Sequence, residues 1–251
     1  MGLNHKKKFV RAAGESCAMK VEVHEIGHSR SRVVVIDDFF NDPQRVVGAA
    51  SALAPFPPEG DTAYPGQRRQ IGPGDAASGY VFAALQSLVP IIRDGFGAES
   101  FGIVEASFSL LTTRPDSLRA VQRVPHFDYD DENILAILHH LHDIPGTGTS
   151  FYRHIETGIE RADKANAQAL RKILQTDGDR PDVAAAGFIG ESNAYYEKIF
   201  TVEGRFNRLV MYQGCLLHSG TINPDFPFSS DPGIGRLTGN MFVQFGDLAV
   251  Q

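Results

Sequence analysis

From residue 103 to residue 245 the sequence repeats one pattern, in which short apolar runs are separated by Gly, Pro and Asp. Runs of this length and composition predict β-strands. The eight runs cover residues 103–112, 120–128, 133–141, 148–154, 197–202, 208–212, 216–219 and 237–245. Eight short strands punctuated in this way are typical of a sandwich or barrel of the jelly-roll kind. We therefore expect a mainly β fold with flanking helices.

The region before residue 102 should support this core. Residues 1–19 are mostly polar and are expected to form a flexible tail, whereas residues 20–251 should form a single domain. Residues 55–73 are rich in Pro and Gly and predict a long loop. Residues 76–96 carry the clearest helical periodicity, and their single apolar stripe should pack against a sheet.

One long interruption separates two of the predicted strands, at residues 157–193. It contains a polar helical stretch at 160–174, a Pro- and Asp-rich turn at 177–182, and a second short helix. We expect this insert to cover an edge or the mouth of the barrel. Residues 20–101 are then the helical and β support, and residues 102–251 are the jelly-roll core.

Composition narrows the classes of partner. The formal net charge is −6, which argues against nucleic acid as the main partner because phosphate binding needs clustered cations. No apolar run approaches the roughly 18 residues of a membrane helix. The two cysteines, Cys17 and Cys215, make no disulfide framework, and no apolar segment follows the N-terminal charges. A reduced, cytoplasmic protein without membrane or nucleic-acid partners is expected.

His126 and Asp128 are the first candidate functional residues. On a strand, their spacing would place both side chains on one face. His218 lies far downstream in another predicted strand and could complete a set of two imidazoles and one carboxylate. That set, with open positions on the metal, is typical of non-haem Fe(II) oxygenases. Taken alone, the His-x-Asp pair also fits a polar strand edge.

Arg236 and Thr238 begin the last predicted strand and share its face. A guanidinium facing into a barrel is costly unless it meets an anion, and its planar fork suits a carboxylate. Thr238 could donate a further hydrogen bond to the same group. The anion could be a bound acid or a buried protein carboxylate, and the sequence leaves both open.

In this order, His126-x-Asp128, Gly148-Thr149, His218 and Arg236-x-Thr238 resemble the Fe(II)/2-oxoglutarate-dependent dioxygenases. The prolyl 4-hydroxylase-like branch is the most similar in layout, and the likeness covers residues 102–251. Two features depart from that branch. Residues 145–149 read Pro-Gly-Thr-Gly-Thr where the branch has Gly-Gly-Glu-Thr, and Arg236 stands where many of its members have Lys.

The resemblance implies a double-stranded β-helix holding one Fe(II) by His126, Asp128 and His218. It implies 2-oxoglutarate as a co-substrate held by Arg236 and Thr238, O₂ as the oxidant, and hydroxylation of a peptide or small-molecule substrate. A homodimer is left open.

Further polar residues could contact substrate or support the pocket. We name Asn240, Tyr152, Arg153 and Tyr212, with Arg208 on the same face as Tyr212. His139 and His140 should face opposite sides of their strand, so both cannot join the metal site, and we interpret them and His142 as structural.

Two alternatives differ from the oxygenase interpretation. In the first, a cupin-like metal enzyme uses no 2-oxoglutarate, and Arg236 binds a substrate acid directly. In the second, a catalytically silent jelly roll serves as a binding module. The intact set of His126, Asp128 and His218 argues against the second alternative.

Overall fold

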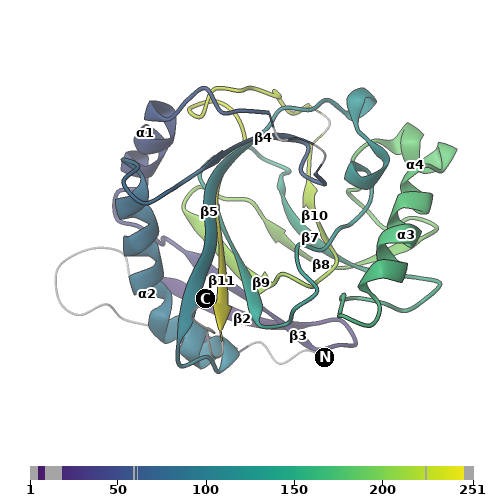
Figure 1. Ribbon diagram of the computed structural model, residues 1–251, viewed down its shortest axis with the longest axis horizontal. Helices are drawn as coiled ribbons and strands as arrows, with labels where there is room; N and C mark the ends of the chain where they lie inside the picture. Colours follow the sequence, from purple (N-terminus) through teal and green to yellow (C-terminus); the bar gives the residue numbers. More distant parts are fainter. Residues whose placement is uncertain (1–4, 9–18, 59, 61, 224, 246–251) are drawn as a thin grey trace.

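Two antiparallel sheets form the centre of the computed structural model, which describes residues 5–8, 19–58, 60, 62–223 and 225–245 (Figure 1). The major sheet has the order β1-β2-β3-β9-β6-β11-β5-β4, and the minor sheet has the order β10-β7-β8. The strands are β1 (His5–Lys8), β2 (Lys20–Ile26), β3 (Ser31–Asp37), β4 (Gly66–Gln70), β5 (Phe101–Leu111), β6 (Ile134–His140), β7 (Gly148–His154), β8 (Tyr196–Glu203), β9 (Arg208–Gln213), β10 (His218–Thr221) and β11 (Leu237–Phe245). The predicted mainly β jelly-roll fold is confirmed.

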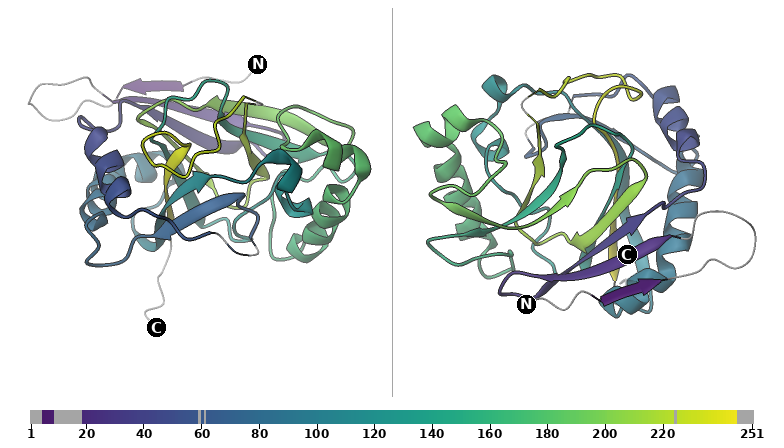
Figure 2. Two further views of the ribbon diagram at one scale, coloured as in Figure 1. Left: turned by 90° about the horizontal axis from the view of Figure 1, so that it is seen from above. Right: turned by 180° about the vertical axis from the view of Figure 1, so that it is seen from behind.

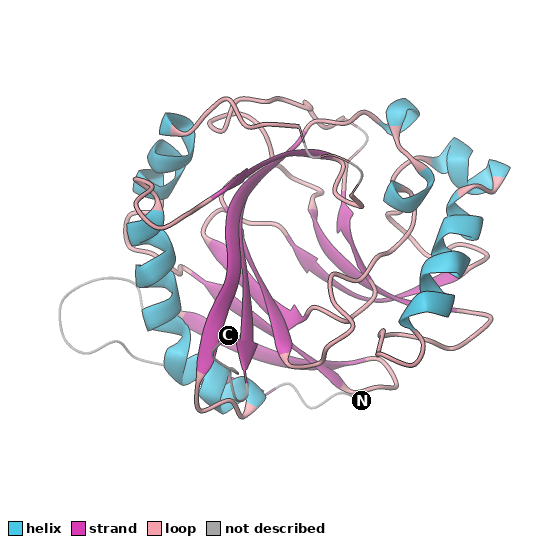
Figure 3. Ribbon diagram, in the orientation of Figure 1, coloured by secondary structure: helices cyan, strands magenta, loops and turns pink. Residues whose placement is uncertain are grey.

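Helices flank the strands on two opposite sides (Figure 3). Helices α1 (Gln44–Ala52) and α2 (Ser78–Phe96) lie on one side, and α3 (Ala167–Gly178) and α4 (Pro181–Ala186) lie on the other. Two short 3₁₀ turns, η1 (Pro115–Ser117) and η2 (Ala120–Gln122), precede the segment that carries His126.

Strand β3 shows how alternation divides the core. Val34 and Ile36 belong to the apolar cluster beneath α2, whereas Val33 and Val35 belong to the cluster on the opposite face of the sheet. All four are at most 7% exposed, so the strand is buried on both faces. The second cluster includes Phe151 of the minor sheet, which places it between the two sheets.

Helix α2 packs on the major sheet as its periodicity predicts. Leu88 and Ile92 are fully buried, and Pro90 lies within the helix without ending it. The contact is closest at Gly239 of β11, where an added Cβ would lie 2.1 Å from Oη of Tyr80. A side chain at position 239 would therefore separate the helix from the strand.

The N-terminal strands extend the major sheet. β2 pairs with β3, and β3 pairs with β9 of the core, so these strands continue the sheet at one edge (Figure 2). Within the predicted tail, residues 5–8 form β1 and pair with β2, in contrast to a tail without structure. The rest of that tail up to residue 18, with Cys17, lies outside the described residues.

Four predicted boundaries need correction. Residues 120–128 form no strand: η2 opens the segment, and His126 makes an isolated bridge to His218. The predicted loop 55–73 contains β4, which pairs with β5. The predicted strand at 216–219 is observed at His218–Thr221. The helix predicted at 160–174 is observed at Ala167–Gly178, within the expected insert between β7 and β8.

No helix in the described part of the chain has the length and apolar character needed to cross a bilayer.

Candidate metal and anion site

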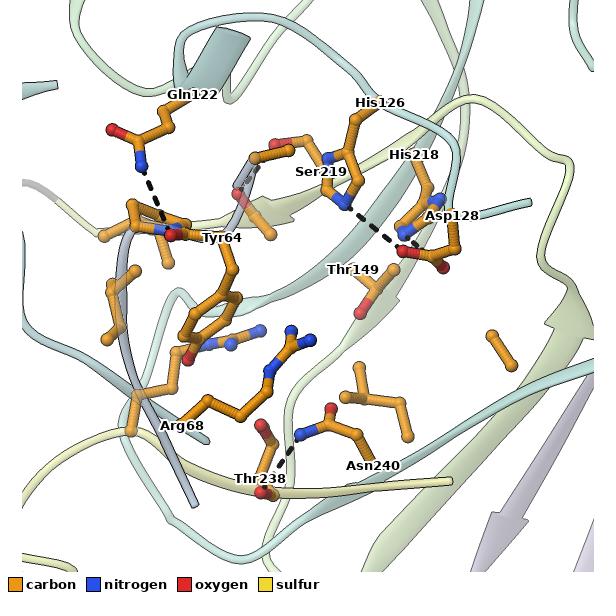
Figure 4. A pocket seen from close by; sticks show the side chains of 18 of the residues that line it. Tyr64, Arg68, Gln122, His126, Asp128, Thr149, His218, Ser219, Thr238 and Asn240 are labelled. Carbon is orange, nitrogen blue, oxygen red and sulfur yellow. Dashed lines mark hydrogen bonds and ion pairs between the residues drawn. The ribbon is translucent and has the colours of Figure 1, made fainter. Parts of the chain in front are cut away.

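A cavity of about 810 Å³ lies between the sheets, and part of it is open to solvent. Both sheets and the loops between them contribute side chains to its wall. Its polar and charged lining residues are Tyr64, Arg68, Gln122, His126, Asp128, Thr149, Tyr212, His218, Ser219, Arg236, Thr238 and Asn240. Figure 4 shows His126, Asp128 and His218 grouped on one side of this space, with Thr238 and Asn240 across it.

Backbone hydrogen bonds bring His126 and Asp128 to His218 although the two histidines lie in separate segments. The amide N–H of His126 donates to the carbonyl of His218, and the amide of His218 donates to the carbonyl of His126, both at 2.8 Å. The amide of Asp128 donates to the carbonyl of Gly214 at 2.8 Å. These bonds fix residues 126–128 alongside residues 214–218, although residues 126–128 do not form a strand.

The three side chains present a compact set of ligand atoms. Asp128 places Oδ1 3.8 Å from Nε2 of His126 and Oδ2 3.5 Å from Nε2 of His218. One ligand atom from each residue lies within 4.8 Å of the other two. Two imidazole nitrogens and a carboxylate on one side of a cavity match the donor set of open, non-haem Fe(II) sites.

The proton positions on the histidines favour metal binding. Nδ1 of His218 lies 2.8 Å from the carbonyl oxygen of Leu216, so Nδ1 carries the proton and donates, leaving the Nε2 lone pair directed at the site. Burial, helped by the charge of Arg68, holds the pKa of His126 well below its usual range, so its imidazole is neutral. Burial raises the pKa of Asp128, and a divalent cation would offset that effect.

Arg236 is a buried guanidinium at the other side of the cavity. It is 4% exposed, and its Nη2 donates to the carbonyl of Gly148 at 2.8 Å. No ion pair with a carboxylate of a described residue accompanies this bond, and Nε has no hydrogen-bond partner. The hydroxyls of Thr238 and Thr149 are also buried without partners. A buried cation beside unpartnered hydroxyls fits a bound acid better than a protein carboxylate.

The remaining predicted residues divide into two groups. Asn240 and Tyr212 line the cavity; Asn240 donates to Oγ of Ser109 at 2.9 Å, and Tyr212 packs edge-on against His218 with ring centroids 4.9 Å apart. Tyr152 and Arg153 are not among the lining residues, and a role for them in supporting the pocket stays a prediction.

Local contacts explain where those two side chains lie. Tyr152 points into the cluster beneath α3 and α4, because β7 presents alternate residues to opposite faces. Arg153 forms ion pairs with Glu160 and Glu197. Arg208, which was grouped with Tyr212, instead pairs with Asp37 and also lies outside the cavity wall.

Four polar residues of the wall were not predicted from the sequence, and they are Tyr64, Arg68, Gln122 and Ser219. Arg68 lies on β4, where Nε donates to Oγ of Ser109 at 3.1 Å and the guanidinium stacks over Tyr64 at 5.0 Å. One sequence signal could have indicated β4: Gly66–Gln70 is a run without Pro inside the Pro-rich residues 55–73. Gln122 donates to the carbonyl of Tyr64 at 3.2 Å and links η2 to this wall.

Comparison with known proteins places the chain in a family. A family model described as "Family of unknown function (DUF6445)" matches residues 17–243. The chain belongs to this family. A search of curated proteins finds no match to this DUF6445 member.

Solved structures share the fold at low sequence identity. SnoN from nogalamycin biosynthesis, described as a non-heme alpha ketoglutarate dependent epimerase, is 12% identical, with a TM-score of 0.53 over 87% of this chain and 79% of its own. HygX from Streptomyces hygroscopicus is 14% identical, with a TM-score of 0.50 over 85% and 82%.

A third likeness bears on the predicted branch. A prolyl-4-hydroxylase from Pseudomonas putida is 16% identical, with a TM-score of 0.45 over 87% of this chain and 95% of its own. The DUF6445 member shares its fold with SnoN and HygX. A score of 0.45 gives no ground for placing it in the prolyl 4-hydroxylase-like branch, which stays a prediction.

Proposed function

We propose that this protein is a non-haem Fe(II), 2-oxoglutarate-dependent oxygenase that hydroxylates a small-molecule or peptide substrate. One observation carries the proposal. A single cavity contains a His, Asp, His ligand set and also a buried guanidinium, Arg236, that no described carboxylate neutralises. A metal site alone would leave Arg236 unexplained, whereas a 2-oxo acid that reaches from the metal to Arg236 accounts for both.

One group of residues would bind the metal, and a second group would bind the co-substrate. His126, Asp128 and His218 would hold Fe(II), and Arg236 with Thr238 would bind the distal carboxylate of 2-oxoglutarate. When bound, iron and co-substrate supply oxidative decarboxylation by O₂ to succinate and CO₂, coupled to oxidation of a substrate C–H bond.

The chain's own groups orient and shield these partners. Nδ1–H of His218 is held by the carbonyl of Leu216, which fixes the ring and keeps Nε2 free of a proton. Tyr212 and Phe242 belong to the apolar cluster between the sheets and exclude water from this side of the cavity. Asn240 offers its amide oxygen to a bound molecule, since its nitrogen already donates to Ser109.

The test is the anaerobic visible spectrum of the Fe(II) protein. We expect a weak charge-transfer band on addition of 2-oxoglutarate, and a large loss of affinity in Arg236→Ala, because a charge-assisted fork to a carboxylate is worth about 1.5–3 kcal/mol. His126→Ala and His218→Ala should lose bound iron in metal analysis. Arg153→Ala is the matched control, since Arg153 lies outside the cavity wall, and it should titrate as the wild type does.

Two results would contradict the proposal. Unchanged iron content in both histidine variants would remove the metal assignment. A normal band in Arg236→Ala would remove Arg236 from its assigned role. Absence of the band in the wild type would favour the cupin-like alternative, in which Arg236 meets a substrate acid instead.

A further inference from the structure

His140 lies next to the anion side of the cavity but has no assigned role. It is the last residue of β6 and is fully buried. In the ladder between β6 and β11 it stands directly opposite Thr238, and directly opposed residues share one face of a sheet. Because Thr238 lines the cavity, His140 belongs to the cavity face of the major sheet, although it is not itself one of the lining residues.

A hydrogen-bond chain fixes the proton on His140. The amide of Ile144 donates to Nδ1 of His142 at 3.3 Å, so this nitrogen carries no proton. Burial and the charge of Arg236 lower the pKa of His142 to about 3, so the ring is neutral and Nε2 holds its single proton. That Nε2–H donates to Nδ1 of His140 at 3.4 Å. His140, whose pKa burial also holds well below the usual range, must then carry its proton on Nε2.

The Nε2–H donor of His140 has no acceptor in the described structure. Its close surroundings contain donors of the same kind: Nε of Arg236 and the hydroxyl of Thr238 are also buried without partners. Arg236 lies two residues before Thr238, the residue that stands directly opposite His140. Adjacent buried donors that lack an acceptor are costly unless an anion meets them.

The neighbouring His139 shows what a structural histidine looks like on this strand. Its Nδ1 lies 3.3 Å from Oη of Tyr80, and its Nε2 lies 3.3 Å from Oδ1 of Asn207. Both ring nitrogens are satisfied on the helix side of the sheet. His140 has only one partner, so the structural interpretation that suits His139 leaves half of the His140 ring unexplained.

We propose that His140 is a binding residue for the carboxylate held at Arg236, and that His142 is a positioning residue which keeps the His140 proton on Nε2. This inference rests on the proposed function, because that carboxylate is the distal group of 2-oxoglutarate. A neutral imidazole adds a hydrogen bond without adding a second positive charge. This side of the cavity therefore offers a carboxylate the charge of Arg236 together with several neutral donors.

The experiment compares two 2-oxo acids in anaerobic calorimetry with the Fe(II) protein. 2-Oxoglutarate carries the distal carboxylate, and 2-oxopentanoate has the same chain length but ends in a methyl group. His140→Phe should weaken 2-oxoglutarate about tenfold, the effect of losing one hydrogen bond to a charged group, and change 2-oxopentanoate less than about twofold. His140→Gln should restore most of the affinity, because its amide N–H can replace Nε2–H.

His142→Phe separates the positioning role from direct contact. Without the donor from His142, the His140 proton can move to Nδ1, so 2-oxoglutarate should bind about threefold more weakly or worse while 2-oxopentanoate is unaffected. This variant also keeps the proposal testable if His140→Phe does not fold. His139→Gln is the control on the same strand and should leave both affinities unchanged.

The outcomes distinguish the two proposals. If the wild type binds 2-oxoglutarate and His140→Phe and His142→Phe bind it equally well, the role of the histidine pair is wrong and the proposed function stands. If either variant weakens both acids alike, the effect is not specific to the carboxylate and the inference is also overturned. If the wild type binds neither acid, the proposed function itself fails.

Discussion

Arg208 and Arg236 are two buried arginines that differ in their hydrogen-bond partners. Arg208 binds Asp37 with both prongs, Nε to Oδ1 at 2.6 Å and Nη2 to Oδ2 at 2.9 Å, and its Nη1 donates to the carbonyl of Glu203. Arg236 has one bond, to a backbone carbonyl. From the sequence, the anionic partner of Arg236 could be either a bound acid or a protein carboxylate. Within the described residues, the protein carboxylate is found at Arg208 and not at Arg236.

The Arg208–Asp37 pair predicts a pH-dependent part of the stability. Burial raises the pKa of Asp37, but the hydrogen bonds and charge of Arg208 outweigh it, so the folded pKa is lowered. The stabilisation is therefore complete above the ordinary carboxyl pKa of about 4 and is lost as the pH falls through the lower folded pKa. Asp37→Asn should reduce the free energy of unfolding at pH 7 by about 2 kcal/mol and flatten its fall below pH 4, measured by urea unfolding.

An exposed pair provides the control for this measurement. Glu25 and Arg30 form an ion pair at 2.6 Å, with 38% and 74% of their side chains exposed. Glu25→Gln should leave the stability nearly unchanged, because solvent screens such pairs. An Asp37→Asn variant with the acid profile of the wild type would show that the buried pair does not cause the acid sensitivity.

The contact between α2 and β11 leads to a prediction about one glycine. An added Cβ at Gly239 would lie 2.1 Å from Oη of Tyr80, which also bonds His139. Gly239→Ala should displace Tyr80, break that hydrogen bond and cost about 1–3 kcal/mol, measured by urea unfolding. Gly79→Ala is the matched control within α2, since nothing lies within 4 Å of its added Cβ, and it should be neutral or stabilising by about 0.5–1 kcal/mol. Equal effects at the two positions would contradict close packing at Gly239.

Elements with a local pattern were predictable, and elements made by distant pairing were not. The periodicity of residues 76–96 and the short β-type runs at 148–154 and 237–245 predicted α2, β7 and β11 within a few residues. β4 is a run of Gly, Gln and Arg with low strand propensity, and it is a strand because the edge of β5 pairs with it. Residues 120–128 have strand-like composition but find only one bridging partner.

The same limit applies to the candidate site. The order of His126, Asp128, His218 and Arg236 could be read from the chain because each residue type is chemically distinctive. The place of Arg68 depends on the pairing of β4 with β5, and the place of His140 depends on the register of β6 with β11. No local pattern encodes either pairing.

At the scale of the whole molecule, the proposed metal site exists only in the folded chain, because its ligands come from segments far apart in the sequence. His218 belongs to the minor sheet, while His126 and Asp128 lie on a loop that reaches it from η2. An ion that binds only the folded chain raises the unfolding free energy by mass action, about 2.7 kcal/mol at 100 times Kd. For a chain of this size we expect a rise in Tm of about 5–10 °C with Fe(II) under anaerobic conditions, reversed by EDTA.

Variants separate the metal from the co-substrate in this thermal measurement. His126→Ala and His218→Ala should abolish the rise, whereas Arg236→Ala should keep it and lose only the additional rise caused by 2-oxoglutarate. A rise of the same size in the histidine variants would locate the stabilising ion elsewhere.

The reciprocal main-chain hydrogen bonds between His126 and His218 position the ligand residues before a metal ion binds. They fix the backbone of the two residues side by side, independently of anything bound between the rings, whose centroids lie 4.4 Å apart. The spacing of the ligands is thus established during folding, so little reorganisation has to accompany loading. Replacing one metal ion by another of similar radius should then leave the backbone around the three ligand residues unchanged.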